Sequence, residues 1–156
     1  MGTPLAAIGV KIGYYVSSTV VDTPPHAAAN TYTHIPDLKT TGDFNPAPNT
    51  ADATTFDNEE YTTYVDLLKD LGGAIEFSAN FTDAFKTAWD ACVSAYADGK
   101  MWFVVDIDGV NKSVYFLGKP SALGMPSLTA NSLIETSVFV TPVGEPVWEA
   151  DPTWAS

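Results

Sequence analysis

Hydrophobic and polar residues alternate in the segment that begins at Gly73. Its apolar residues fall at every second position: Ile75, Phe77, Ala79 and Phe81. Glu76, Ser78 and Asn80 occupy the intervening positions. Because successive side chains of a β-strand point to opposite faces of a sheet, this pattern predicts a half-buried strand.

The spacing of apolar residues then changes to that of an α-helix. One apolar stripe, with the i, i+4, i+7 spacing of a helix face, consists of Phe85, Trp89, Cys92, Val93 and Tyr96. Thr82 is placed to cap the N-terminus, and Gly99 is expected to follow the last turn. We therefore predict a helix between Thr82 and Gly99 whose apolar stripe, Cys92 included, lies in the core.

Two strands joined by a tight turn are predicted after the helix. Residues 101–107 are apolar almost throughout, which is typical of a strand covered on both faces. Asp108 and Gly109 favour a two-residue turn in which both residues have positive φ. The chain is then expected to return as an antiparallel strand over residues 111–117.

Shorter patterns predict the remaining strands. Residues 8–18 contain apolar residues at alternate positions, and residues 59–68 have a strand-like pattern through Tyr61, Tyr64 and Val65. Residues 31–39 are rich in β-branched and aromatic side chains. Pro36 confines the latter segment to a sheet edge or ends it. The last strand, 133–141, has two sides, with Ile134, Val138 and Val140 on one and Glu135 and Ser137 on the other.

Three segments are expected to lie outside regular structure. Residues 40–58 contain two prolines and few large apolar groups, and long segments of this kind are usually binding loops or disordered. We predict a mobile arm that a neighbouring subunit orders; a plain flexible surface loop is the alternative. Residues 121–132 are a polar connection, and residues 142–156, which carry Trp148 and Trp154, are expected to dock on their own sheet or on a neighbour.

These elements together predict a mainly β fold with one α-helix. Chains of this length with about seven antiparallel strands generally close into a sandwich or barrel. We expect residues 1–156 to form a single domain, a two-sheet antiparallel β-sandwich or barrel flanked by the helix, with a long inter-strand arm.

The charge limits the partners that the protein can bind. Seven basic residues, all Lys, stand against 19 acidic residues and give a net charge of −12. Without arginine the chain lacks a bidentate donor for phosphate, and its charge argues against tight nucleic-acid binding through counterion release. A lone cysteine indicates a reducing compartment, and no segment approaches the ~20 apolar residues of a membrane span. We expect an intracellular protein without a membrane partner.

The residue patterns of catalytic and metal sites are missing from the sequence. His26 and His34 do not have zinc-ligand spacing, and residues 106–109 resemble a calcium loop without its required Glu. Glu59 and Glu60 are adjacent and would face opposite sides of a strand. We therefore predict no catalytic residues, no metal and no cofactor, and we do not expect an enzyme.

Two stretches carry a family resemblance. Residues 58–85, NEEYTTYVDLLKDLGGAIEFSANFTDAF, lead into the amphipathic helix and then MWFVVDIDGVNKSVYFLGKP at 101–120. Residues 128–148 read LTANSLIETSVFVTPVGEPVW. In composition and order these stretches resemble the major tail tube proteins of long, non-contractile-tailed bacteriophages. The tubes of contractile injection devices are a closely related alternative.

The resemblance implies a structural virion protein that assembles in the host cytoplasm. Copies would form hexameric rings that stack into the tail tube, together with tape measure, tail tip initiator and tail terminator proteins, and the genome would pass through unbound during ejection. The arm would contact the adjacent ring through Thr41, Phe44, Pro46, Pro48, Phe56 and Asp57. The alternation of side chains along the strands suggests Glu76 and Glu135 as the acids that would line the lumen. The alternative is that they face solvent or a subunit interface.

A carbohydrate-binding β-sandwich is the alternative from a different functional class. Four Trp and seven Tyr on an acidic, strand-rich chain could supply rings that stack on sugars. Trp89 and Trp102 are expected in the core, which leaves Trp148 and Trp154 for such a role.

Overall fold

The computed structural model describes residues 9–25, 31–52, 64–70 and 73–154, with the backbone alone over 47–52 and 64–70. This part of the chain contains one helix, α1 (Asp83–Ala95). The strands are β1 (Lys11–Val16), β2 (Thr31–His34), β3 (Leu38–Thr41), β4 (Ala47–Asp52), β5 (Tyr64–Asp70), β6 (Ile75–Asn80), β7 (Met101–Asp106), β8 (Lys112–Pro120), β9 (Glu135–Pro142), β10 (Val147–Ala150) and β11 (Thr153–Trp154).

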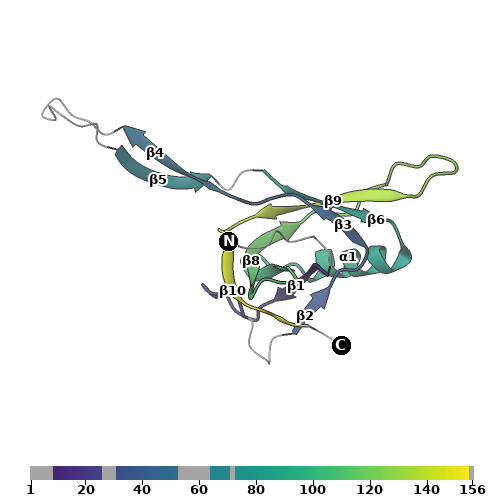
Figure 1. Cartoon of the computed structure of the whole chain (residues 1–156), viewed down its shortest axis with the longest axis horizontal. Coiled ribbons are helices and arrows are strands. Elements are labelled where there is room, and N and C mark those ends of the chain that lie inside the picture. The colour runs from purple at the N-terminus through teal and green to yellow at the C-terminus, as the bar shows by residue number, and fades with distance from the viewer. Residues whose placement is uncertain (1–8, 26–30, 53–63, 71–72, 155–156) are drawn as a thin grey trace, which may run out of the picture.

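All strands except β4 and β5 belong to one curled sheet with the order β11-β2-β1-β7-β8-β9-β6-β3, in which β10 also pairs with β8. Its ladders are antiparallel except for that between β11 and β2. The curl places β3, β6 and β9 over β1, β7 and β8, and α1 lies along one open side (Figure 1). The protein thus has the mainly β, sandwich-like fold with one helix that the sequence predicts.

Strand β8 belongs to both layers of the curled sheet. Its first residues pair with β10 along one edge, and the opposite edge pairs with β7. Its last residues, Gly118 to Pro120, pair with β9 in the other layer. A Cβ at Gly118 would lie 2.5 Å from Val140 Cγ1 on the paired strand β9 and 3.2 Å from the Phe103 ring on β7, so neighbouring side chains already fill the space that a side chain here would need.

The main core lies between the two layers and the helix. Phe85, Trp89 and Cys92 are fully buried, and Val93 and Tyr96 pack against them half-buried, so the predicted apolar stripe is confirmed. The indole Nε1 of Trp89 donates a hydrogen bond to the carbonyl oxygen of Ser121 at 2.8 Å. Burial of each large side chain contributes about 1.5–3 kcal/mol, which makes this stripe a main source of stability.

The helix begins as predicted but ends earlier than Gly99 suggests. Thr82 Oγ1 accepts a hydrogen bond from the Phe85 backbone N–H at 3.1 Å and donates one to Asp37 at 2.5 Å. Tyr96 has ψ 130° and caps the helix without a left-handed residue, because its ring turns toward the core. Gly99, with φ +72°, instead serves the turn that leads into β7.

The turn between β7 and β8 differs from the prediction. Gly109 has φ +91°, whereas Asp108 does not have positive φ. The Val110 N–H donates to the Ile107 carbonyl at 3.2 Å, so Asp108 and Gly109 are the two central residues of a β-turn in which only the glycine needs the left-handed region.

Residues 31–39 form two strands that lie in different layers. Pro36 ends the first segment, and Asp37, with φ +65°, redirects the chain into β3. The strand predicted over 133–141 begins at Glu135, so Ile134 lies outside it and is exposed, whereas Val138 and Val140 of the same predicted side are buried. Residues 121–132 contain no strand or helix, as expected.

The prediction of an unstructured segment at 40–58 is wrong for most of its described residues. Thr40 and Thr41 belong to β3, and residues 47–52 form β4, which pairs antiparallel with β5. Pro48 lies where the β4–β5 register is irregular, so its missing N–H is accommodated. Strand β5 continues to Asp70, two residues beyond the strand predicted over 59–68. Residues 53–63, including Phe56, Asp57, Glu59 and Glu60, lie outside the described part.

Candidate functional site

One exposed sheet surface carries both acidic residues nominated from the sequence. We call it the outer face: the sides of β3, β6 and β9 that point away from the core. Cross-strand pairing places Glu76 beside Phe139 and Asn80 beside Glu135. The alternation of buried and exposed residues in β6 and β9 puts Glu76 and Glu135 on this same surface.

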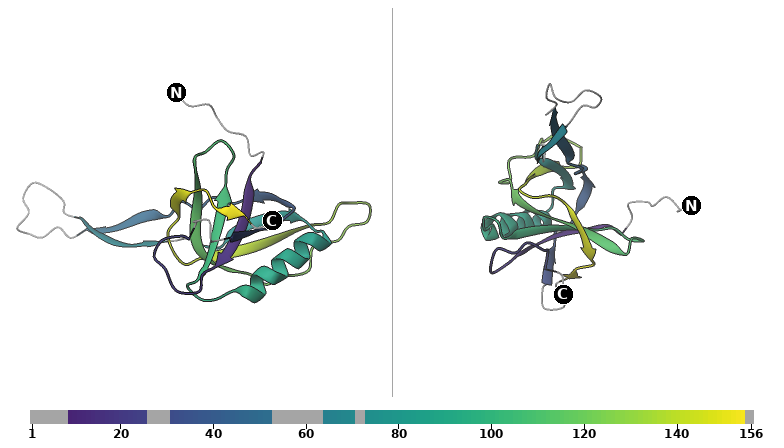
Figure 2. Two further views of the ribbon diagram at one scale, coloured as in Figure 1. Left: turned by 90° about the horizontal axis from the view of Figure 1, so that it is seen from below. Right: turned by 90° about the vertical axis from the view of Figure 1, so that its left-hand side faces the viewer.

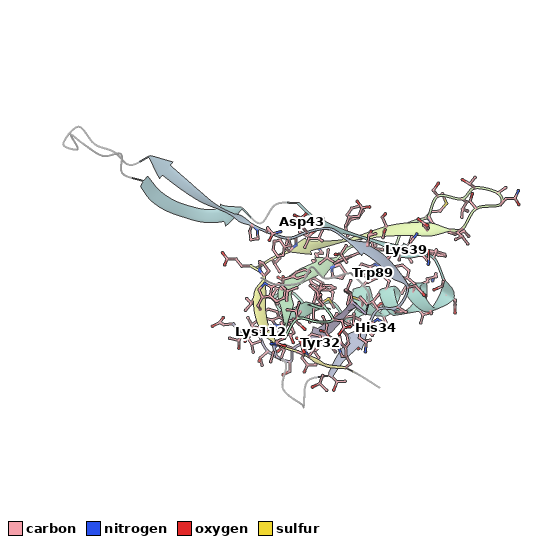
Figure 3. All side chains as sticks on the ribbon, in the orientation of Figure 1. Tyr32, His34, Lys39, Asp43, Trp89 and Lys112 are labelled. Atoms are coloured by element: carbon pink, nitrogen blue, oxygen red, sulfur yellow. The ribbon has the colours of Figure 1, made fainter. Side chains whose placement is uncertain are left out.

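The acids of the outer face are already engaged within the chain. Lys39 Nζ lies 2.6 Å from Glu135 Oε1, and Ser137 Oγ donates to Glu76 Oε1 at 3.0 Å. A register shift between Leu38 and Thr40 leaves both Lys39 and Thr40 exposed, and Thr40 hydrogen-bonds Ser78. An exposed ion pair contributes about 0–1 kcal/mol, so its main effect is to make this surface polar and weakly charged. Lys39 is labelled on this layer in Figure 3.

A second feature, the projecting hairpin, consists of β4 and β5. These strands pair with each other and, among the described residues, with no strand of the curled sheet. The hairpin extends away from the body along the long axis of the molecule (Figure 1). A two-stranded hairpin alone is at best marginally stable in water, so this element needs a packing partner to be firmly ordered.

A third feature, the apolar loop, consists of residues 121–134 between β8 and β9. Met125 is 88% exposed, Leu133 86% and Leu128 63%, and the loop contains no charged residue. The left view of Figure 2 shows this loop at the end of the molecule opposite the projecting hairpin. Monomeric proteins rarely gather several large apolar side chains in this way on one exposed surface.

A fourth feature, the hairpin-base groove, lies where the chain leaves β3 for β4. It has a volume of about 320 Å³ and is lined by residues 41–45, Ile75, Phe77, Val105, Ile107, Val114, Phe116, Pro146 and Trp148. Phe44 packs edge-on against Phe116 at 5.5 Å between ring centroids, whereas Trp148 stays 48% exposed. Asp43 marks this region in Figure 3.

The C-terminal segment lies on its own sheet, one of the two positions expected for it. Strand β10 pairs with β8, and β11 pairs with β2. Trp154 lies near His34 and Lys11, and its Nε1 donates to Asp106 at 3.4 Å. Burial, followed by the nearby Lys11 charge, lowers the pKa of His34. Trp154 is thus engaged in packing, which leaves Trp148 as the one exposed indole of the four tryptophans.

Several polar groups in the body of the molecule act in structural contacts. Ser113 is fully buried, and its Oγ lies 2.8 Å from Asp151 Oδ1 and 3.2 Å from Asp106 Oδ1, so its one hydroxyl proton can be donated to either carboxylate. Burial raises the pKa of the Cys92 thiol to about 12. Within the described ranges, no group of three or more His, Cys, Asp or Glu residues is arranged to hold a metal ion. His26 lies outside these ranges.

The structure brings together some predicted site residues and separates others. Glu76 and Glu135 share a surface, whereas Thr41 lies in β3, Phe44 packs on its own core, and Pro46 and Pro48 lie at the start of the projecting hairpin. Sequence reasoning missed the apolar loop, because it predicts residues 121–132 to be a polar connection. An uncharged segment rich in Leu, Ile and Met within so acidic a chain was the available signal.

Comparison with known proteins identifies no relative. The chain matches no model of a known protein family, and it matches none of the curated proteins. Among the described residues, no helix combines the length and the apolar character needed to cross a membrane.

Proposed function

We propose that this protein is a structural subunit that assembles with copies of itself, head to tail, into rings that stack as a tube. The supporting observation is the pair of projections at opposite ends of the molecule: a hairpin without a partner strand in the sheet, and an uncharged loop with exposed Met125 and Leu133. Each of these features lacks the packing that it requires, and a second molecule can supply it.

The symmetry of such contacts favours closed or extended assemblies. When two different surfaces of one molecule meet, the contact is heterologous, and repetition gives a ring if the rotation closes or a filament if it does not. A subunit that joins through its two ends therefore assembles without a separate scaffold. Stacking of such rings requires a second contact between them, and stacked rings correspond to the tail tube of a long-tailed bacteriophage, which the sequence resembles.

The outer face supplies the surface for a passing genome in this proposal. Glu76 and Glu135 would face the lumen among serine, threonine and asparagine side chains, with Lys39 pairing one of the acids. At physiological salt the Debye length is about 8 Å, so the acids repel phosphates only at close range. A polar lining without arginine gives DNA few cationic groups to hold, which permits passage without adhesion.

The proposal extends to location and partners. The protein would reside in the virion, after assembly in the host cytoplasm, and would contact tape measure, tail tip initiator and tail terminator proteins. It would perform no catalysis. The alternative, a carbohydrate-binding module, depends on Trp148 alone, because the other three tryptophan rings are buried or packed.

Electron microscopy of the purified protein over a concentration series tests the proposal. The decisive variant joins Ala47 to Asp70 through Asn-Gly and so removes the projecting hairpin; these two residues are paired, and Asn-Gly forms a two-residue turn. We expect the wild-type protein to form rings or tubes and this variant to remain a folded monomer. A wild-type protein that stays monomeric at all concentrations and binds glycans through Trp148 would overturn the proposal in favour of the alternative.

A further inference from the structure

The distribution of charge restricts where two copies of this chain can touch. With 19 acidic and 7 basic residues, copies repel one another over most of their surface. Residues 121–134 contain no charged side chain. Among the residues that line the hairpin-base groove, Asp43 alone is charged. These two surfaces can therefore approach each other without burying several carboxylates.

The two surfaces also have complementary shapes. The apolar loop is a protrusion, and more than four-fifths of the surface of Met125 and of Leu133 is exposed on it. The groove is a hollow of about 320 Å³ whose walls include Phe44, Ile75 and Trp148. This volume corresponds to roughly ten water molecules at about 30 Å³ each, enough for a few apolar side chains to replace that water.

Their positions in the molecule prevent one copy from satisfying itself. The groove lies at the base of the projecting hairpin, and the apolar loop lies at the opposite end of the long axis (Figures 1 and 2). Loop and groove of the same chain therefore cannot meet, whereas those of two copies related head to tail can. Such a contact is heterologous and leaves a free loop and a free groove for the next copy.

We propose that the apolar loop of one copy inserts into the hairpin-base groove of the next, so that Met125 or a neighbouring apolar side chain packs against the exposed ring of Trp148. This inference rests on the proposed function, because it assigns one of the subunit contacts that the head-to-tail assembly requires, the packing of the projecting hairpin being another. Methionine suits the contact, since its flexible thioether fits irregular apolar surfaces and makes favourable contacts with aromatic rings.

Cross-linking tests the contact directly. In the double variant Met125→Cys/Trp148→Cys, oxidation should produce a ladder of covalent dimers, trimers and larger multimers. The matched control Met125→Cys/Ser137→Cys keeps the loop cysteine but places the second one on the outer face, and it should produce dimers without an extended ladder. The native Cys92 does not interfere, because it is fully buried.

A pair of aromatic substitutions gives an independent measurement. Trp148 and Phe139 are both large exposed aromatic residues, at 48% and 41%, but Phe139 lies on the outer face. Trp148→Ala should raise the protein concentration needed for assembly by at least about tenfold, as for a residue at the centre of an interface. Phe139→Ala should leave it unchanged, and circular dichroism should show that both variants are folded.

The outcomes separate this inference from the proposed function. Wild-type rings or tubes, with equal cross-linking in both double variants and normal assembly of Trp148→Ala, would overturn the loop-in-groove contact and leave the tube proposal intact. A ladder from the Met125→Cys/Trp148→Cys variant, together with a wild-type protein that forms neither rings nor tubes, would support the contact and overturn the tube. Assembly of Trp148→Ala at the wild-type concentration would count against the contact even if a ladder formed.

Discussion

The body of the molecule and its two projections differ in where their packing partners lie. In the body, Phe85, Trp89 and Cys92 are enclosed between the helix and both layers of the sheet. In the projections, β4 and β5 pair only with each other among the described strands, and Met125 and Leu133 extend into solvent. The contacts of the body therefore determine its fold, whereas the projections depend on a molecule outside the chain.

This difference separates two properties that substitutions can change. A change in the body should lower the free energy of unfolding, and it should affect assembly only through that loss. A change in a projection should leave unfolding nearly unaltered while it weakens assembly. The four predictions below test this separation, from the largest expected effect on stability to the smallest.

Trp89→Ala should cause the largest loss, because it empties the centre of the core and removes the hydrogen bond to the Ser121 carbonyl. We expect a decrease in the free energy of unfolding of about 3–5 kcal/mol, measured by urea denaturation. Thr87→Ala, on the exposed side of the same helix, should change it by less than about 0.5 kcal/mol. Equal effects of the two substitutions would contradict the assigned core.

Gly118→Ala should destabilise the protein by about 1–3 kcal/mol through overpacking. A Cβ at this position would lie 2.5 Å from Val140 Cγ1 and 3.2 Å from the Phe103 ring, where the two layers meet. Gly124→Ala is the matched control, since a Cβ there meets no atom within 4 Å. Thermal unfolding should show a lower midpoint for the first variant and an unchanged one for the second.

Thr82→Ala should lower the free energy of unfolding by about 1 kcal/mol, because the Phe85 N–H loses its cap. The same substitution removes the hydrogen bond to Asp37, which connects the start of β3 to the start of the helix. Thr82→Ser keeps a hydroxyl at the same place and should restore most of the stability. If serine is no better than alanine in urea denaturation, the cap does not contribute as described.

Leu133→Ser should have the smallest effect on unfolding, within about 0.5 kcal/mol, because the side chain is already exposed in the monomer. The same variant should nevertheless assemble less readily, since an apolar residue of the projecting loop has been lost. Light scattering over a concentration series checks assembly, and urea denaturation checks stability. A clear loss of stability without loss of assembly would reverse the comparison between body and projections.

Periodic patterns in the sequence were sufficient to predict the main strands and the helix of the body. Strands β6 and β9 alternate because one face of each is buried, and the helix has an apolar stripe from Phe85 to Tyr96 for the same reason. The structure buries these faces. The layered β fold with one helix followed from them. A local pattern can identify a buried face because the core selects apolar residues at the period of the element.

The projections and the long-range contacts could not be predicted in the same way. Two prolines at 46 and 48 suggested irregular structure, whereas β4 tolerates Pro48 at an irregular point of its ladder. The pairing of Lys39 with Glu135 joins residues that are distant in sequence, and it depends on a register shift in β3. The exposure of the apolar loop depends on where β8 and β9 end, which local composition does not determine.

The projecting hairpin lies between β3 and β6 in the chain, and β3 and β6 are themselves neighbours in the sheet. Strand β6 in turn pairs with β9 from Ile75 to Asn80. Cross-strand hydrogen bonds run perpendicular to the strands, so tension applied lengthwise through the hairpin would shear this whole ladder at once rather than open it bond by bond. The hairpin is therefore attached to the body through one of its mechanically most resistant joints.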